Sequence, residues 1–112
     1  MVGAPPRVPE ISAEELKTLR DAGSPVVLVD VREPREYAVS DLPGSVKIPL
    51  GTFPQNFGKI AKDADVVVYC RSGARSAQAV QFLLANGYAK SRNLAGGING
   101  WAEVVDPTMQ KY

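Results

Sequence analysis

Two short runs of apolar residues constrain the fold of this chain more than any other feature. Val26–Val31 reads VVLVDV, and Val66–Tyr69 reads VVVY. Nearly continuous apolar runs of this length are typical of strands that are covered on both faces of a parallel sheet. Strand-like and helix-like segments alternate along the chain without an internal repeat. The pattern predicts a three-layer α/β domain with a mainly parallel central sheet and helices on both faces.

The boundaries of the expected helices carry recognisable signals. Ser12–Glu15 matches a capping box, with Ser12 as N-cap, and Gly23 suits the end of that helix. A glycine, Gly87, likewise follows the helix expected over Ala77–Asn86. The other expected elements are a closing helix over Ile98–Val105, with Trp101 in the core, and short strands at Val46–Ile48 and Asn93–Leu94.

Length and proline content set the domain organisation. The chain has 112 residues, which is a common size for one domain. Met1–Pro9 contains three prolines and predicts a flexible, proline-rich linker or arm. We therefore expect the folded domain to cover residues 10–112.

Composition excludes several functions. The chain has no histidine, which rules out Cys-His and Ser-His-Asp catalysis and histidine metal sites, and one cysteine gives neither an internal disulfide nor a zinc cluster. The 13 basic and 12 acidic residues nearly cancel, so no nucleic-acid or membrane partner is expected. No apolar stretch approaches the roughly 20 residues of a membrane span, and the first residues lack the charged and then apolar layout of a secretory signal. These features predict a cytoplasmic protein, whose reducing surroundings would keep the cysteine free.

Cys70 has the most informative setting of any polar residue. It follows the second apolar run and opens the sequence Cys70–Arg75 (CRSGAR), just before a helix. Gly73 allows the loop to curl so that backbone N–H groups point inward at a helix N-terminus. The dipole of that helix and the cations Arg71 and Arg75 favour a thiolate, which is a nucleophile and a carrier of sulfur. The alternative interpretation is that Cys70 is a small buried apolar residue, as lone cysteines often are.

The length of the loop separates two chemistries. Cysteine-dependent phosphatases need one more residue between the cysteine and the arginine than the four found between Cys70 and Arg75. A shorter loop forms a tighter ring of donors, which matches one sulfur atom better than a phosphate. The spacing therefore favours sulfur transfer over phosphatase or arsenate reductase chemistry.

Four segments together resemble single-domain rhodaneses, which are sulfurtransferases. They are Val29–Tyr37 (VDVREPREY), Leu42–Leu50 (LPGSVKIPL), Tyr69–Ser76 (YCRSGARS) and Asn93–Trp101 (NLAGGINGW). The resemblance implies a mainly parallel sheet of about five strands. It also implies that Cys70 takes up sulfane sulfur as a persulfide, cradled by the N–H groups of the loop, and passes it to an acceptor. No metal and no organic cofactor is expected.

The two ends of the chain resemble a narrower group. Val8–Ser12 and Trp101–Tyr112 are similar to the C-terminal rhodanese domain of molybdopterin-synthase sulfurylases, in which an adenylyltransferase is fused to a rhodanese domain. This resemblance implies a role in molybdenum cofactor biosynthesis. It also implies a ubiquitin-like sulfur carrier protein as acceptor and a fused or associated adenylyltransferase domain as partner. A rhodanese-like binding module without turnover remains the alternative, although such modules usually lack the cysteine.

Two departures from the rhodanese pattern bear on the sulfur donor. Asp41 stands where many rhodaneses have a histidine, and Glu36 stands where users of thiosulfate often have an arginine. A carboxylate at the mouth of the pocket would repel the thiosulfate dianion. A protein persulfide is therefore expected to be a better donor than thiosulfate.

The remaining candidate residues have both functional and structural interpretations. Around the thiol, the loop residues Arg71, Ser72, Gly73, Ala74, Arg75 and Ser76 are expected to bind substrate, while Ser72 and Ser76 could instead cap the helix. Asp30 and Arg32 are expected to support the loop or to form a buried ion pair. Arg35 and Glu36 are expected at a solvated helix start, and Arg75 is a candidate partner for Asp30.

Overall fold

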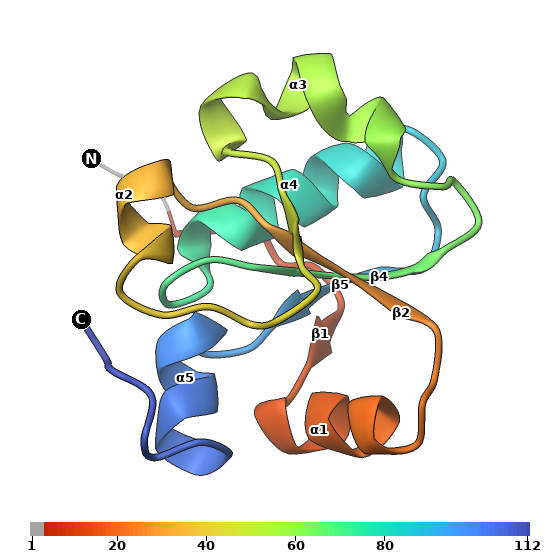
Figure 1. Cartoon of the computed structure of the whole chain (residues 1–112). Coiled ribbons are helices and arrows are strands. Elements are labelled where there is room, and N and C mark those ends of the chain that lie inside the picture. The colour runs from red at the N-terminus through yellow and green to blue at the C-terminus, as the bar shows by residue number, and fades with distance from the viewer. Residues whose placement is uncertain (1–3) are drawn as a thin grey trace.

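The computed structural model describes residues 4–112, which form one α/β domain (Figure 1). A five-stranded sheet has the order β1-β5-β4-β2-β3, and each strand pair is parallel. The fold class expected from the sequence is thus confirmed. The strands are β1 (Glu10–Ile11), β2 (Val26–Asp30), β3 (Val46–Lys47), β4 (Asp65–Tyr69) and β5 (Ser91–Leu94); the helices are α1 (Ala13–Asp21), α2 (Pro34–Tyr37), α3 (Phe53–Asn56), α4 (Ala74–Ala85) and α5 (Gly97–Val104), with 3-10 turns at Leu50–Thr52 and Phe57–Lys59.

Helices cover both faces of the sheet, with α3 and α4 on one side and α1 and α5 on the other (Figure 1). Each face has its own apolar core. Val68 and Cys70 of the β4 region pack in the core under α3 and α4, whereas Val67 and Tyr69 pack in the core under α1 and α5. Because successive strand side chains point to opposite faces, this alternation places the thiol on the α4 side. Asp30 is in register with Tyr69 and therefore lies on the other side.

The first helix begins as the sequence predicts. The Ser12 hydroxyl accepts a hydrogen bond from the Glu15 N–H, and the Glu15 carboxylate accepts one from the Ser12 N–H, each at 3.1 Å. This pair completes the capping box. The helix ends at Asp21 with Ala22 as C-cap, and Gly23 follows with a φ of 72°.

Two elements were not expected from the sequence. The edge strand β1 has only two residues, and the run around α3 contains glycine and proline like a loop. Aromatic packing stabilises the α3 region, because Phe53 and Phe57 both contact Phe82 of α4 edge-on, at 5.9 and 4.9 Å between ring centroids.

The N-terminal arm contacts the domain where the structure describes it. Met1–Gly3 lie outside the described residues. Val8 packs against the core under α4, and the Pro9 carbonyl accepts a hydrogen bond of 2.8 Å from the Asn93 N–H of β5. Within residues 4–112, no helix is both long enough and apolar enough to cross a membrane.

Candidate active site

Cys70 lies directly after β4, a central strand of the sheet, and the loop that it opens leads into α4. The carboxyl ends of parallel strands are where such sheets bind ligands. The sequence places the thiol at this position because the apolar β4 is buried and Gly73, with a φ of 115°, allows a sharp turn into the helix. The predicted order of strand, loop and helix around Cys70 is therefore present.

The carbonyl groups of the loop accept hydrogen bonds from neighbouring elements. At the start of α5, the N–H groups of Ile98 and Asn99 donate to the carbonyls of Cys70 and Arg71 at 2.9 and 3.1 Å. The Asn93 amide donates to the Gly73 carbonyl at 3.0 Å. Because the carbonyls face outward, the loop N–H groups are free to face inward. The Gly73 N–H donates to the Cys70 sulfur at 3.1 Å.

The surroundings of the sulfur favour its ionised form. Burial raises the pKa of the Cys70 thiol, but hydrogen bonds from the Ser76 hydroxyl and from the backbone N–H groups of Ser76, Gly73 and Ser72 outweigh it and lower the pKa below the ordinary value. The Ser76 oxygen lies 3.3 Å from the sulfur. Hydrogen bonds to an anion are stronger than those to a neutral group, so this set of donors stabilises a thiolate.

The thiol is covered. Cys70 is only 1% exposed, although a nucleophile must be reached by its substrate. Two clefts lie beside it. One of about 550 Å³ is lined by Ser72 to Ala74 and by the N-terminal arm, and one of about 640 Å³ is lined by Arg71, Arg75 and α2. Both clefts are bordered by residues of the loop that Cys70 opens, so they are the openings beside the sulfur.

Gly97 allows α5 to approach the loop. A Cβ atom there would lie 2.4 Å from the Arg71 carbonyl oxygen and 2.5 Å from its carbon, and Gly97 has a φ of 61°. Contacts this short between a Cβ and backbone atoms do not occur in proteins without displacement. The second glycine of Gly96-Gly97 is thus a support of the loop, whereas the sequence indicated only a turn.

We expect Gly97→Ala to reduce sulfur transfer by roughly tenfold to a hundredfold, because a displaced loop misplaces the nucleophile. Gly51→Ala is the matched control, since a Cβ at Gly51 meets no atom within 4 Å. The two variants are compared in steady-state transfer rate and thermal stability. A wild-type rate for Gly97→Ala would show that the close approach of α5 is not needed.

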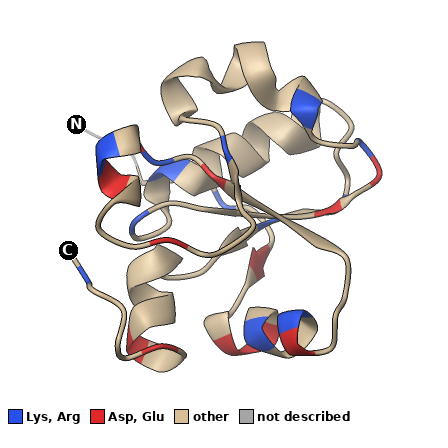
Figure 2. Cartoon of the chain, viewed as in Figure 1, with Lys and Arg blue, Asp and Glu red and all other residues tan. Residues whose placement is uncertain are grey.

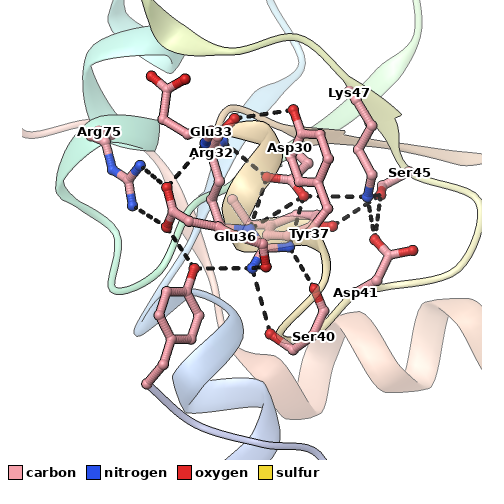
Figure 3. A network of polar contacts seen from close by, with 12 residues as sticks. Asp30, Arg32, Glu33, Glu36, Tyr37, Ser40, Asp41, Ser45, Lys47 and Arg75 are labelled. Atoms are coloured by element: carbon pink, nitrogen blue, oxygen red, sulfur yellow. Dashed lines mark hydrogen bonds and ion pairs between the residues drawn. The ribbon is translucent and has the colours of Figure 1, made fainter.

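Arg75 pairs with Glu36 and not with Asp30, so the partner expected from the sequence is wrong. The guanidinium donates to both carboxylate oxygens of Glu36, at 2.7 and 2.9 Å (Figure 3). Glu36 is 8% exposed, which also corrects the expectation that it is solvated. Arg75 holds the pKa of the Glu36 carboxyl well below its usual range, against the opposing effect of burial. The pair neutralises the carboxylate that was expected to repel thiosulfate.

Asp30 and Arg32 form the buried ion pair that the sequence analysis gave as one alternative. Arg32 is fully buried, and its Nη2 lies 2.9 Å from an Asp30 oxygen. Nη2 also donates to the Ser40 carbonyl, Nε donates to Asp30, and Nη1 donates to the Glu36 carbonyl and the Tyr112 hydroxyl (Figure 3). Burial opposes the charge, but the hydrogen bonds to Asp30 and Tyr112 raise the pKa of Arg32 above its ordinary value. Arg32 is connected to the loop through Glu36 and Arg75, and also through Tyr112, whose ring lies under Arg71.

The other cations of the site are exposed. Arg71 lies over the ring of Tyr112, 5.2 Å from its centroid, and borders the cleft beside Arg75. Arg35 on α2 borders the same cleft and is exposed, as expected from the sequence. Basic and acidic residues alternate around α2 and do not form a face of one sign (Figure 2).

Sequence reasoning missed Asn93 and Tyr112 as parts of the site. Asn93 stands in an expected strand, and its contact with the loop depends on the pairing of β5 with β4. Tyr112 lies far along the chain from Glu36, to which its hydroxyl donates at 2.6 Å. The only signal was that both residues fall in the segments that carry the resemblance to rhodaneses. Within residues 4–112, no three His, Cys, Asp or Glu side chains gather as metal ligands.

The comparisons with known proteins agree with this geometry. The family model for the rhodanese-like domain matches residues 12–104. A sulfurtransferase of Allochromatium vinosum is 44% identical over 95 residues, which cover 85% of this chain and 89% of that protein. The adenylyltransferase and sulfurtransferase MOCS3-2 of Zea mays is 31% identical over 96% of this chain, which spans 24% of the plant protein.

Solved structures show the same fold. The human single-domain sulfurtransferase TSTD1 superimposes with a TM-score of 0.76 at 30% identity, covering 88% of this chain and 98% of that one. A rhodanese-like domain protein of Staphylococcus aureus gives a TM-score of 0.80 at 32% identity. With its nucleophile loop, parallel sheet and these relatives, the chain belongs to the rhodanese-like family, as a sulfurtransferase of the rhodanese type.

Proposed function

We propose that Cys70 carries sulfane sulfur as a persulfide and passes it to a nucleophilic acceptor, within a sulfurtransferase domain that covers residues 10–112. The single observation that supports this most is the arrangement of N–H groups around the sulfur, with the Gly73 N–H 3.1 Å away. Donors fixed in this way stabilise a negative charge on sulfur without rearrangement during the reaction. The site works without a general base, because the thiolate forms before the substrate arrives.

The transfer takes two displacements. In the first, the Cys70 thiolate attacks the sulfane sulfur of the donor and forms a new S–S bond. The bond between that sulfur and the rest of the donor breaks, and the leaving group takes the electron pair; with thiosulfate, sulfite leaves. In the second, an acceptor attacks the outer sulfur, and the thiolate of Cys70 leaves with the electron pair.

Arg71 is the loop cation that we assign to the incoming substrate. Arg75 is already paired with Glu36, so its charge is largely neutralised, whereas Arg71 is exposed beside the same cleft. Ser72 and Ala74 border the other cleft, and Ser76 contacts the sulfur itself. Asp30 and Arg32 support the site from the opposite face of the sheet.

A narrower proposal concerns the acceptor. The plant relative is named as an adenylyltransferase and sulfurtransferase, and this chain matches about a quarter of it. A Bacillus subtilis relative, 33% identical over 84% of this chain, is named as a putative sulfur carrier protein. We infer that the acceptor is a ubiquitin-like sulfur carrier protein whose C-terminal carboxyl has been activated by an adenylyltransferase, as in molybdenum cofactor biosynthesis in the cytoplasm. With this acceptor the second step differs from attack on the outer sulfur: the Cys70 persulfide would attack the activated carboxyl carbon and displace AMP. A thiol reductant would then cleave the S–S bond of the acyl disulfide, which leaves a thiocarboxylate on the carrier and returns Cys70 to a thiol.

The acceptor is tested by mixing persulfide-loaded protein with an adenylated ubiquitin-like carrier and a thiol reductant, then recording the mass of the carrier. We expect the carrier to gain the mass difference between sulfur and oxygen with wild type and not with Cys70→Ala. A carrier of unchanged mass, beside normal turnover of thiosulfate with cyanide, would contradict this acceptor and leave sulfur transfer intact.

A binding module is the competing function, and the covered thiol is the observation in its favour. A binding module would bind its partner equally well when Cys70 is replaced by alanine, and the wild-type protein would transfer no sulfur. Turnover of a sulfane donor by wild type, but not by Cys70→Ala, would contradict the binding-module interpretation.

A further inference from the structure

The hydroxyl group of Ser76 lies between two hydrogen-bond acceptors. Its oxygen is 2.6 Å from the amide oxygen of Asn93 and 3.3 Å from the sulfur of Cys70. Ser76 is fully buried and Asn93 is 3% exposed, so these side chains depend on each other for partners. A hydroxyl group has a single proton to donate.

The orientation of the Asn93 amide decides which atom faces Ser76. Its nitrogen donates to the Gly73 carbonyl at 3.0 Å, so its oxygen faces the hydroxyl. An amide oxygen accepts and does not donate. At 2.6 Å the contact between the two oxygens is favourable only when the proton of Ser76 lies between them.

The contact between Ser76 and Asn93 favours a neutral thiol, and it thus opposes the backbone N–H groups of the loop, which favour the thiolate. The thiol of Cys70 can donate to Ser76 while Ser76 donates to Asn93, so every group has a partner. When Cys70 ionises, Ser76 either turns a lone pair toward the anion or gives its proton to the sulfur and leaves the Asn93 oxygen unpaired. Both arrangements cost free energy, because an unpaired buried acceptor is unfavourable.

The charged groups near Cys70 do not remove this competition. Arg75 on α4 is the cation that interacts with the sulfur, and Glu36 of α2 is bound to Arg75. On the neighbouring strands, Asp30 of β2 is paired with Arg32, and β5 presents the uncharged Asn93. At the start of α5, the backbone N–H groups of Ile98 and Asn99 donate to carbonyls of the loop, and neither residue carries a charge.

We propose that Asn93 is a positioning residue that competes with the sulfur of Cys70 for the single proton of Ser76. The competition keeps the thiolate from being overstabilised. A thiolate that is too stable is a weak nucleophile, since nucleophilicity falls with basicity. The proposal rests on the proposed function in taking Cys70 as the nucleophile, but its test measures ionisation and not sulfur transfer.

The test is the pH dependence of alkylation of Cys70, the only cysteine in the chain, by iodoacetamide. Asn93→Leu removes the competing acceptor, and we expect the acid dissociation constant of Cys70 to rise roughly tenfold, the size of one charge-assisted hydrogen bond. Adding Ser76→Ala to the wild-type protein should change the acid dissociation constant of Cys70 by less than about threefold. Adding it to the Asn93→Leu variant should lower this constant roughly tenfold.

Asn93→Asp is the matched control. It loses the same donor to the Gly73 carbonyl but keeps an acceptor facing Ser76, so it should lower the acid dissociation constant. If both Asn93 variants raise it, loosening of the loop is the cause and the proposal fails. The proposal also fails if Ser76→Ala alone lowers the acid dissociation constant tenfold or more. That result would show that Ser76 already donates its proton to the sulfur when Asn93 is present. Loss of sulfur transfer with the expected ionisation pattern would instead contradict the proposed function.

Discussion

Replacing Arg32 by methionine should lower the free energy of unfolding by about 3–5 kcal/mol, the cost of breaking a buried ion pair from one side. The change leaves the Asp30 carboxylate buried and removes the donors to Ser40 and Tyr112. Lys47 remains 3.3 Å from Asp30 and compensates in part. Urea denaturation measures the effect.

The control for this substitution is Arg35→Met, which removes the same charge from an exposed position and should change stability by less than about 0.5 kcal/mol. Asp30→Asn combined with Arg32→Met should recover part of the loss, because no unpaired charge is then buried. Equal stabilities of Arg32→Met and Arg35→Met would contradict the importance of the buried pair.

Replacing Cys70 by alanine should abolish sulfur transfer while the fold is retained. The chain has no other cysteine and no histidine to replace the thiolate. Because the pKa of Cys70 is lowered on folding, the thiolate fraction falls as the pH drops through the folded-state value. The transfer rate of wild type should therefore rise with pH and reach its plateau at lower pH than the alkylation of a free cysteine peptide.

The matched control is Ser24→Ala, a half-buried residue in the loop before β2, which should keep the wild-type rate. Rates are measured with thiosulfate and cyanide at several pH values, together with melting curves. A residual rate in Cys70→Ala above that without protein would place the reaction at another group.

The sequence predicted the central sheet because its signals are local. The apolar runs of β2 and β4 and the capping box of α1 each act within a few residues. The two-residue strand β1 could not be found in this way, since it is defined by pairing with β5. The α3 region depends on packing against α4 and carries no local helical pattern.

The candidate site was predicted in part for the same reason. The position of Cys70 after a buried strand and the turn at Gly73 follow from local sequence. The pairing of Glu36 with Arg75 and the contacts of Asn93 and Gly97 with the loop join residues far apart in the chain. Such contacts depend on the packing of α2, α5 and β5 around the loop, which composition and spacing do not encode.

The central claim is that Cys70 accepts sulfur despite its low exposure, and the intact mass of the protein after incubation with a sulfane donor tests it most directly. We expect wild type to gain the mass of one sulfur atom, to lose it on addition of cyanide, and Cys70→Ala to gain none. An unchanged mass of wild type, or equal loading of Cys70→Ala, would contradict the account.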